Sequence, residues 1–238
     1  MNYGIKTLNL IKELYPICRS LTGKGNRETL KIINKRLKSL KIIEIKSGTK
    51  IFDWTVPPEW EINDSYIILP NKKKIAKFKD SNLHILNYSH PINKTVNFKE
   101  LKEHLFTIKK KPNLIPYVTS YYKKKWGFCI THNEMKKLKE GKYKVFIDSK
   151  LNKNGSLSIG QYFIKGKVSK TVLITSNICH PSLVNNELSG PCLATTLAEY
   201  LSKKKNYFSY KFVFFPETIG SLCYIKKNFQ FLKKNFIA

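Results

Sequence analysis

The stretch ITSNICHPSLVNNELSG, residues 174–190, decides the predicted fold of this chain. It starts as the end of a nearly continuous apolar strand, passes through a histidine and a turn, and runs into a helix beginning near Gly190 and Pro191. Proline in the first turn, with glycine as a possible cap, is typical of a helix start. A second apolar strand, YKFVFF, is followed by another helical pattern from Ile219 to about Leu232. Apolar strands alternating with helices predict an α/β protein with a doubly wound, largely parallel sheet.

Helical spacing of apolar residues extends this core toward the N-terminus. It predicts helices at residues 5–18 and 27–40, followed by a short strand at 42–46. The helix at 191–201 carries an apolar stripe that we expect to pack in the core. The stripe consists of Leu193, Ala194, Leu197, Ala198 and Leu201.

The middle of the chain has a different texture. Short strand candidates broken by proline and asparagine include IFDWTV, SYIIL and LHILNYS, and a strand is also expected at 126–130. Short helices are expected at 98–105, capped by Asn97, and near Thr131. We therefore predict two domains. The α/β core is built from residues 1–48 and 155–238, and a β-rich insert occupies residues 49–154.

Composition limits the class of protein. With 238 residues and 42% hydrophobic content, the chain is long enough to bury a substantial core. The sequence contains no run approaching the roughly 20 apolar residues that a membrane span needs, and its start lacks the apolar segment of a signal peptide. We therefore expect a cytoplasmic protein without a membrane partner.

The formal charge of +28 suggests nucleic-acid binding, but the distribution of the charge argues against it. Lysines are scattered along the chain, whereas arginine occurs only at positions 19, 27 and 36. Readers of phosphate and bases favour arginine because its planar guanidinium binds in a bidentate manner. We expect weak, salt-sensitive adsorption and no specific nucleic-acid partner.

The cysteines predict neither a disulfide framework nor a zinc ribbon. The five residues are odd in number, widely spaced and without a CxxC pair. Most are expected to be small buried side chains. A thiolate role stays open for Cys179 alone, because it directly precedes His180.

Two chemically active side chains follow the two core strands. His180 comes after TVLITSN, and Glu217 comes after YKFVFFP. Open α/β sheets bind ligands at the carboxyl ends of their strands, so these side chains converge if the strands are neighbours. Imidazole and carboxylate are zinc ligands, and a carboxylate near a metal-bound water is a suitable general base. The alternative is a histidine that hydrogen-bonds a loop, beside an exposed glutamate.

Longer motifs carry a resemblance to a known family. They are RSLTGKGNRETL, GTKIFDWTVPPEW, NLHILNYSHPINK, IPYVTSYYKKKWGFC, DSKLNKNGSLSIG, ICHPSLVNNELSG and FVFFPETIGS, spread from about Ile5 to Gln230. They resemble a bacterial family of aminopeptidase-like proteins, which is similar to the di-zinc aminopeptidases. The resemblance implies an inserted small β domain, a C-terminal winged-helix domain in full-length members, and an association with surface-polysaccharide genes.

The resemblance also implies roles for individual residues. His180 matches the first metal histidine of the family, and Glu217 matches the glutamate that acts as general base. Asn186 occupies the position of an aspartate that bridges two metals, and Thr218 that of a second, metal-binding glutamate. Asparagine offers one neutral oxygen and an NH2 group, so two close cations are disfavoured. We expect one weak zinc site at most, from His180, Glu217 and the Asn186 oxygen, where full family members hold two ions. Glu187 is a poorer substitute, because the next residue on a tight turn usually points elsewhere.

These expectations lead to a hydrolase with impaired or absent activity. The implied mechanism polarises a peptide or amide carbonyl on zinc, while Glu217 takes a proton from a bound water and passes it to the leaving amine. The bridging carboxylate is replaced, and the further ligands of the family lie beyond residue 238, so we expect a truncated enzyme. Such a chain would depend on a C-terminal half or a homo-oligomer partner. The alternative is a non-catalytic binding or partner protein in a surface-polysaccharide pathway.

Overall fold

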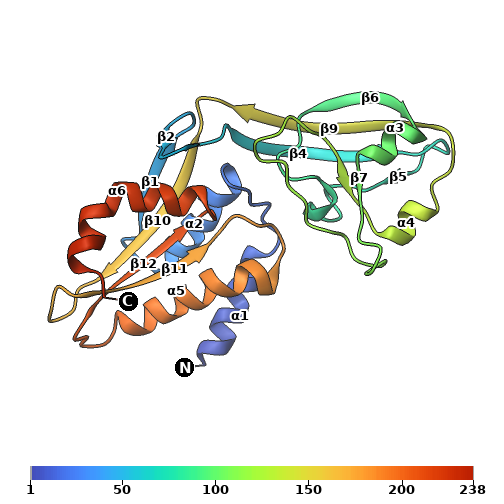
Figure 1. Cartoon of the computed structure of the whole chain (residues 1–238). Coiled ribbons are helices and arrows are strands. Elements are labelled where there is room, and N and C mark those ends of the chain that lie inside the picture. Colours follow the sequence, from blue (N-terminus) through green and yellow to red (C-terminus); the bar gives the residue numbers. More distant parts are fainter. Residues whose placement is uncertain (1, 238) are drawn as a thin grey trace. The chain divides into compact units, whose positions relative to one another are not determined.

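The computed structural model describes residues 2–237 and forms its main sheet from strands that are distant in sequence (Figure 1). β11 (Thr171–Asn177) and β12 (Ser209–Phe215) pair in parallel. β10 (Ser156–Ile164) lies antiparallel against β12, and β1 (Lys41–Lys46) lies antiparallel against β10, in the order β1-β10-β12-β11. The predicted α/β class is confirmed. The sheet is mixed, however, and its parallel pairing is confined to β11 and β12, where we expected a largely parallel sheet.

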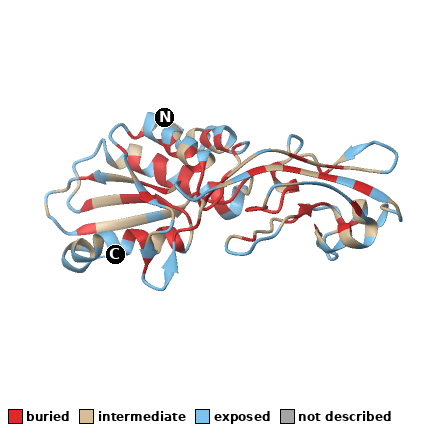
Figure 2. Ribbon diagram, turned by 90° about the horizontal axis from the view of Figure 1, so that it is seen from above, coloured by how far each residue is buried: buried red, intermediate tan, exposed pale blue. Residues whose placement is uncertain are grey.

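Helices cover both faces of this sheet. Residues along β12 alternate, so Phe212 and Phe214 face α2 (Lys24–Arg36) and α5 (Ser189–Leu201), while Lys211 and Phe215 contact aromatic rings of α6 (Ile219–Asn235). α1 (Tyr3–Leu14) packs on α5. Burying a phenylalanine stabilises the fold by about 1.5–3 kcal/mol. Figure 2 shows buried residues concentrated in the strands and on the inner sides of the helices. The core cluster comprises Leu30, Ile33, Leu37, Leu40, Ile164, Ile178, Ala194, Ala198, Phe212 and Phe214.

Both N-terminal helices are confirmed with shifted ends. α1 ends at Leu14 rather than residue 18, because Pro16 has no N–H to continue the helical hydrogen bonds. α2 starts earlier than predicted and ends at Arg36. Its chain then turns through Ser39, which has φ of 85°, and the side chain of Asn34 accepts the N–H of Leu40 at 3.1 Å.

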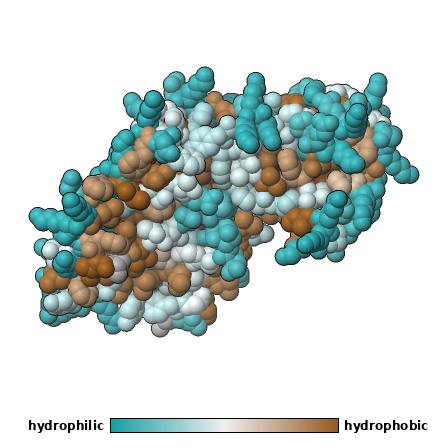
Figure 3. Space-filling view, viewed as in Figure 1, coloured by the Kyte–Doolittle hydropathy of each residue, from teal (hydrophilic) through white to brown (hydrophobic). Residues whose placement is uncertain are grey.

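The start of α5 corrects two expectations. A single π-helical turn, η2 (Val184–Leu188), runs directly into the helix, so Gly190 lies inside its first turn instead of capping it. The predicted apolar stripe is wrong for Leu193 and Leu197, which are 61% and 37% exposed, whereas Ala194 and Ala198 are buried. The sheet lies against the face of α5 that carries its smaller side chains. Figure 3 shows apolar side chains at the surface between hydrophilic ones.

The chain folds into two compact units. One unit comprises Met1–Glu59 and Lys153–Ala238, and the other is Trp60–Asn152. The first unit therefore extends past the predicted boundary at residue 48. It includes the hairpin of β2 (Lys50–Ile51) and β3 (Trp54–Thr55), whose Lys50 carbonyl accepts from Lys226 Nζ of α6 at 3.0 Å.

The second unit is rich in short strands, which form two sheets. The larger sheet has the order β5 (Lys74–Ile75), β4 (Glu59–Ile68), β9 (Lys142–Asn152), β6 (Ile92–Asn97), and β7 (Leu105–Phe106) and β8 (Phe128–Cys129) form a parallel pair. Helix caps at Asn97 and Thr131 are confirmed, the latter as a capping box with Glu134. The short helices of this unit are η1 (Asn82–His84), α3 (Phe98–Glu103) and α4 (His132–Lys136).

One strand candidate of this unit is wrong. LHILNYS does not form a strand, because the Ser81 hydroxyl accepts the N–H of Leu83 and starts the short 3-10 helix η1. Within residues 2–237, no helix has both the length and the apolar character that a membrane crossing requires.

Candidate metal centre

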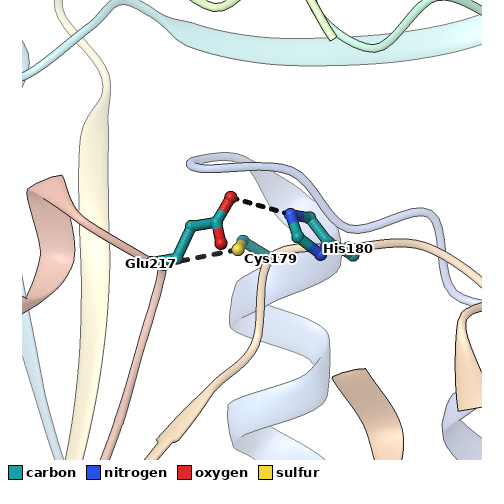
Figure 4. A group of neighbouring side chains, drawn as sticks. All are labelled: Cys179, His180 and Glu217. Atoms are coloured by element: carbon teal, nitrogen blue, oxygen red, sulfur yellow. Dashed lines mark hydrogen bonds and ion pairs between the residues drawn. The ribbon is translucent and has the colours of Figure 1, made fainter. Parts of the chain in front are cut away.

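The two parallel strands bring His180 and Glu217 together at one edge of the sheet. Asn177, the last residue of β11, lies opposite Phe215, the last residue of β12, and the N–H of Ile178 donates to the Phe215 carbonyl at 3.1 Å. After each of these strands, the polypeptide turns across the same end of the sheet. Nε2 of His180 lies 2.9 Å from Oε1 of Glu217 (Figure 4). The convergence expected from the two strand ends is present in the structure.

The other ring nitrogen of His180 faces two oxygen atoms. Nδ1 lies 2.9 Å from Oδ1 of Asn186 and 3.3 Å from Oε2 of Glu187. Both ring nitrogens therefore face hydrogen-bond acceptors, and a neutral imidazole, which carries a single N–H, can donate to one side only. With the proton on Nδ1, Nε2 presents its lone pair to the Glu217 carboxylate, and a proton or a metal ion between these two atoms makes their contact favourable.

Asn186 contacts His180, but from the side away from Glu217. Its exposed side chain extends from the π-helical turn η2 to Nδ1, whereas Glu217 lies at Nε2. A metal ion binds one ring nitrogen and is commonly supported by a hydrogen bond from the other. In this arrangement Asn186 orients the imidazole, and its expected role as a direct ligand stays a prediction.

The expectation that Glu187 points elsewhere is wrong. The π-helical turn rotates this side chain inward, where it is only 3% exposed. Its Oε1 accepts the backbone N–H groups of both Cys179 and His180, the latter at 3.0 Å. Glu187 therefore holds the loop after β11 through two backbone groups and reaches the His180 ring as well. Sequence reasoning missed this role because it assumed a tight turn.

Arg19 supports the same loop from the N-terminal segment. Its side chain is fully buried, and its Nε donates to the His180 carbonyl at 3.1 Å while Nη1 donates to the Leu14 carbonyl at 2.7 Å. Burial lowers the pKa of the guanidinium, and the negative charge of Glu187 acts in the opposite direction. A buried arginine and a buried glutamate thus hold the two peptide groups of His180 from opposite sides.

Cys179 completes a cluster of donor atoms at this edge. Its sulfur accepts the backbone N–H of Glu217 at 3.3 Å, which links the loop after β11 to the loop after β12. The ligand atoms of Cys179, His180 and Glu217 all lie within 4.8 Å of one another. Burial, reinforced by the charge of Glu187, raises the pKa of this thiol well above 9.0. Position next to His180 was the only sequence signal for Cys179.

Backbone strain flanks the cluster. Thr218, directly after Glu217, has φ of 55° and ψ of −84°, and Ser182, two residues after His180, has φ of 47°. Non-glycine residues rarely adopt positive φ, least of all when they are β-branched like threonine. Such conformations tend to gather at functional sites. Thr218 stands at the position where the resemblance implied a second metal-binding glutamate, and a threonine has no carboxylate.

The donor chemistry fits one divalent cation of the zinc class. Imidazole nitrogen, carboxylate oxygen and thiol sulfur are the three groups that zinc prefers in proteins. The contact between His180 and Glu217 offers a lone pair and a negative charge to a common point.

Comparison with known proteins shows the family to which this chain belongs. A family model described as "Domain of unknown function (DUF4910)" matches residues 8–237. A curated protein of Clostridium acetobutylicum, named a putative polysaccharide biosynthesis protein with aminopeptidase-like domain, is 49% identical over 230 residues. These residues make up 97% of this chain and 52% of that protein, so the chain spans about half the length of this curated relative.

Solved structures of other proteins have folds similar to that of this chain. A crystal structure of a putative peptidase from Clostridium acetobutylicum matches with a TM-score of 0.94 and 48% identity, over 98% of this chain and 55% of that one. BSAP, a zinc aminopeptidase from Bacillus subtilis, matches with a TM-score of 0.60 and 12% identity, over 99% of this chain and 68% of that one. A peptidase M28 precursor from Shewanella amazonensis matches with a TM-score of 0.62 and 10% identity, over 98% of this chain and 69% of that one. At these identities the last two matches show a shared fold alone, so the expected resemblance to the aminopeptidases is confirmed at the level of the fold. The chain belongs to the DUF4910 family.

Proposed function

We propose that this chain binds a single zinc-class cation between His180 and Glu217 and hydrolyses peptide or amide bonds with low efficiency. The observation that carries the proposal is the distance of 2.9 Å between Nε2 of His180 and Oε1 of Glu217 at the ends of two parallel strands. Membership of a family with an aminopeptidase-like relative supports the same reaction class.

Each side chain has a defined part in this proposal. His180 holds the cation through Nε2, because Asn186 and Glu187 occupy its Nδ1 side. A bound divalent cation polarises the scissile carbonyl and makes water more acidic. Glu217 is 39% exposed at its side chain, so its carboxylate is accessible to water and to substrate. The carboxylate can take a proton from water and deliver it to the leaving amine.

The proposal includes low efficiency because of Asn186. An anionic bridging side chain would attract cations, whereas an amide contributes a neutral oxygen that hydrogen-bonds Nδ1 of His180. Asn186→Asp places a carboxylate where this amide stands. The variant is expected to bind zinc more tightly and to cleave aminoacyl-nitroanilides faster than the unchanged chain.

Calorimetric titration with Zn²⁺ and a nitroanilide assay test the proposal together. The unchanged chain should bind one zinc ion, and Glu217→Gln should weaken binding and abolish cleavage. Glu100→Gln, a change in an exposed ion pair of the other unit, serves as the matched control and should leave both unchanged. If the unchanged chain binds no zinc, the proposal is wrong.

A second candidate is a non-catalytic role in a surface-polysaccharide pathway. Two observations favour it: the neutral residue at position 186, and the name of the Clostridium relative, a putative polysaccharide biosynthesis protein. The same experiments separate the two candidates. Zinc binding without cleavage, in the unchanged chain and in Asn186→Asp alike, would favour the non-catalytic role.

A further inference from the structure

The third donor beside His180 and Glu217 in the structure is a thiol. Cys179 is fully buried and lies with the other two in a cluster whose ligand atoms are all within 4.8 Å. Cys129, Cys192 and Cys223 are equally buried. Among residues 2–237, however, the cluster around Cys179 is the only group of three or more histidine, cysteine or acidic side chains with ligand-like spacing.

The contacts of Cys179 suit a thiolate bound to a metal ion. Its sulfur accepts the backbone N–H of Glu217 at 3.3 Å, and hydrogen bonds to sulfur stabilise the negative charge of a metal-bound thiolate. Burial opposes ionisation of an isolated thiol, but a nearby dication reverses that preference and deprotonates a coordinating thiol outright.

The geometry favours Cys179 over Asn186 as the additional ligand. Asn186 hydrogen-bonds Nδ1 of His180, on the far side of the ring from Glu217. For the amide oxygen of Asn186 to bind a cation held by Nε2, the Asn186 side chain would have to leave this position. Cys179 already contacts the Glu217 backbone, so modest side-chain adjustment would suffice to bring three donors to one ion.

We propose that Cys179 is a metal ligand, so that its sulfur, a ring nitrogen of His180 and a carboxylate oxygen of Glu217 bind one zinc-class cation and leave one position open. This inference rests on the metal site of the proposed function. Binding breaks the S–H bond of Cys179 and forms a metal–sulfur bond. The proton passes to the buffer, and no electron is transferred. Three protein ligands with an open fourth position are the arrangement of catalytic zinc sites.

Cobalt substitution tests the inference without any activity measurement. Zn²⁺ has a filled d shell and is spectroscopically silent, whereas Co²⁺ reports its ligands by absorption. The 238-residue chain titrated with Co²⁺ should show visible d–d bands and, in addition, a near-ultraviolet sulfur-to-cobalt charge-transfer band. Proton release into a weak buffer during the titration should accompany the charge-transfer band.

Cys179→Ser provides the decisive variant, because a hydroxyl still accepts the N–H of Glu217 but is a poor metal ligand. Loss of an outer-shell partner typically lowers metal affinity by about 10–100-fold, so loss of this ligand should lower Co²⁺ affinity at least that much. The charge-transfer band should disappear. Cys223→Ser, at another buried thiol, should keep both band and affinity. Circular dichroism verifies that both variants fold.

The possible outcomes separate this inference from the proposed function. Visible bands without a charge-transfer band in the unchanged chain would overturn the role of Cys179 and leave a metal site without sulfur. A charge-transfer band that persists in Cys179→Ser or disappears in Cys223→Ser would also overturn it. If the unchanged chain binds no Co²⁺ at all, the metal site itself is wrong, and the proposed function fails with it.

Discussion

Arg19 donates a hydrogen bond to the carbonyl of His180 across 161 positions of sequence, with Nε 3.1 Å from the oxygen. Glu187 accepts the N–H of the same histidine at 3.0 Å. The histidine at the centre of the candidate site is therefore fixed by its backbone on both sides. Two oppositely charged and almost wholly buried side chains provide this support.

Replacing Arg19 by methionine tests this support. Arg19→Met keeps the volume but removes both hydrogen bonds to buried carbonyls and the positive charge that acts on the buried Glu187 carboxylate, so the free energy of unfolding should fall by about 3–5 kcal/mol. Urea denaturation measures the change. Arg36→Met is the control, since the hydrogen bond from Arg36 to the Lys6 carbonyl is only partly buried. This variant should lower the free energy of unfolding by less than about 1.5 kcal/mol. Adding Glu187→Gln to Arg19→Met should recover part of the loss, and strictly additive losses would contradict the coupling.

Glu187→Gln by itself should weaken metal binding more than it weakens the fold. The amide oxygen can still accept the two N–H groups of the loop, but the negative charge beside Nδ1 of His180 is gone. We expect Co²⁺ affinity to fall by about 10–100-fold, as for other outer-shell carboxylates. Glu199→Gln, on helix α5, should leave the affinity unchanged. Equal affinities for Glu187→Gln and the unchanged chain would remove Glu187 from the site.

Acid stability should depend on the pair of Arg27 and Glu59. Burial alone would raise the pKa of Glu59, but hydrogen bonds from the Arg27 guanidinium and the Ser156 N–H outweigh it and hold the pKa below 4.5. A carboxyl whose pKa is lower in the folded state contributes stability above its unfolded pKa. That stability is lost as the pH falls through the folded pKa.

Arg27→Gln should therefore shift the acid limb of the unfolding profile to higher pH. With the guanidinium gone, burial becomes the dominant influence on Glu59 and its pKa rises. At neutral pH the variant should lose about 1.5–3 kcal/mol, the range for hydrogen bonds to charged groups. Lys94→Gln removes an exposed ion pair with Glu100 and should cost less than about 1 kcal/mol. An unchanged acid limb in Arg27→Gln would contradict the assignment.

Gly25→Ala should destabilise the segment that carries Arg19. A Cβ atom at Gly25 would lie 2.0 Å from the carbonyl oxygen of Cys18 and 3.3 Å from the α-carbon of Arg19. These are backbone atoms that no side-chain rotation can move away, so the loss should be about 1–3 kcal/mol despite the better helix propensity of alanine. Gly4→Ala in α1 meets only the Asn2 side chain at 3.3 Å and should be close to neutral. Thermal unfolding of both variants makes the comparison.

The sequence was sufficient to predict the meeting of His180 and Glu217. Apolar patterns located β11 and β12, and the parallel arrangement of neighbouring strands implies that residues after them share one edge. Local capping chemistry likewise located the helices after Asn97 and Thr131. These features depend on residues close in sequence or on a general rule of topology.

Other features depended on contacts that no local pattern encodes. The position of Glu187 follows from a π-helical turn that carries its side chain to the buried side, and no local sequence pattern distinguished this turn from the tight turn that was assumed. The mixed sheet follows from the insertion of β10 next to β12, which a strand-helix-strand pattern does not predict. The exposure of Leu193 depends on which face of α5 lies against the sheet, and small residues, not the leucines, occupy that face.

Strand β11 lies at the edge of its sheet, and this has a consequence for local opening near the site. Within residues 2–237, β11 pairs with β12 along its length and on its other side only through Thr171, near Phe236. About every other amide of an edge strand points away from its neighbour. Deuterium should therefore enter β11 quickly at alternate positions. The amides of Cys179 and His180, held by Glu187, should exchange slowly and mark a rigid point at the end of a softer strand.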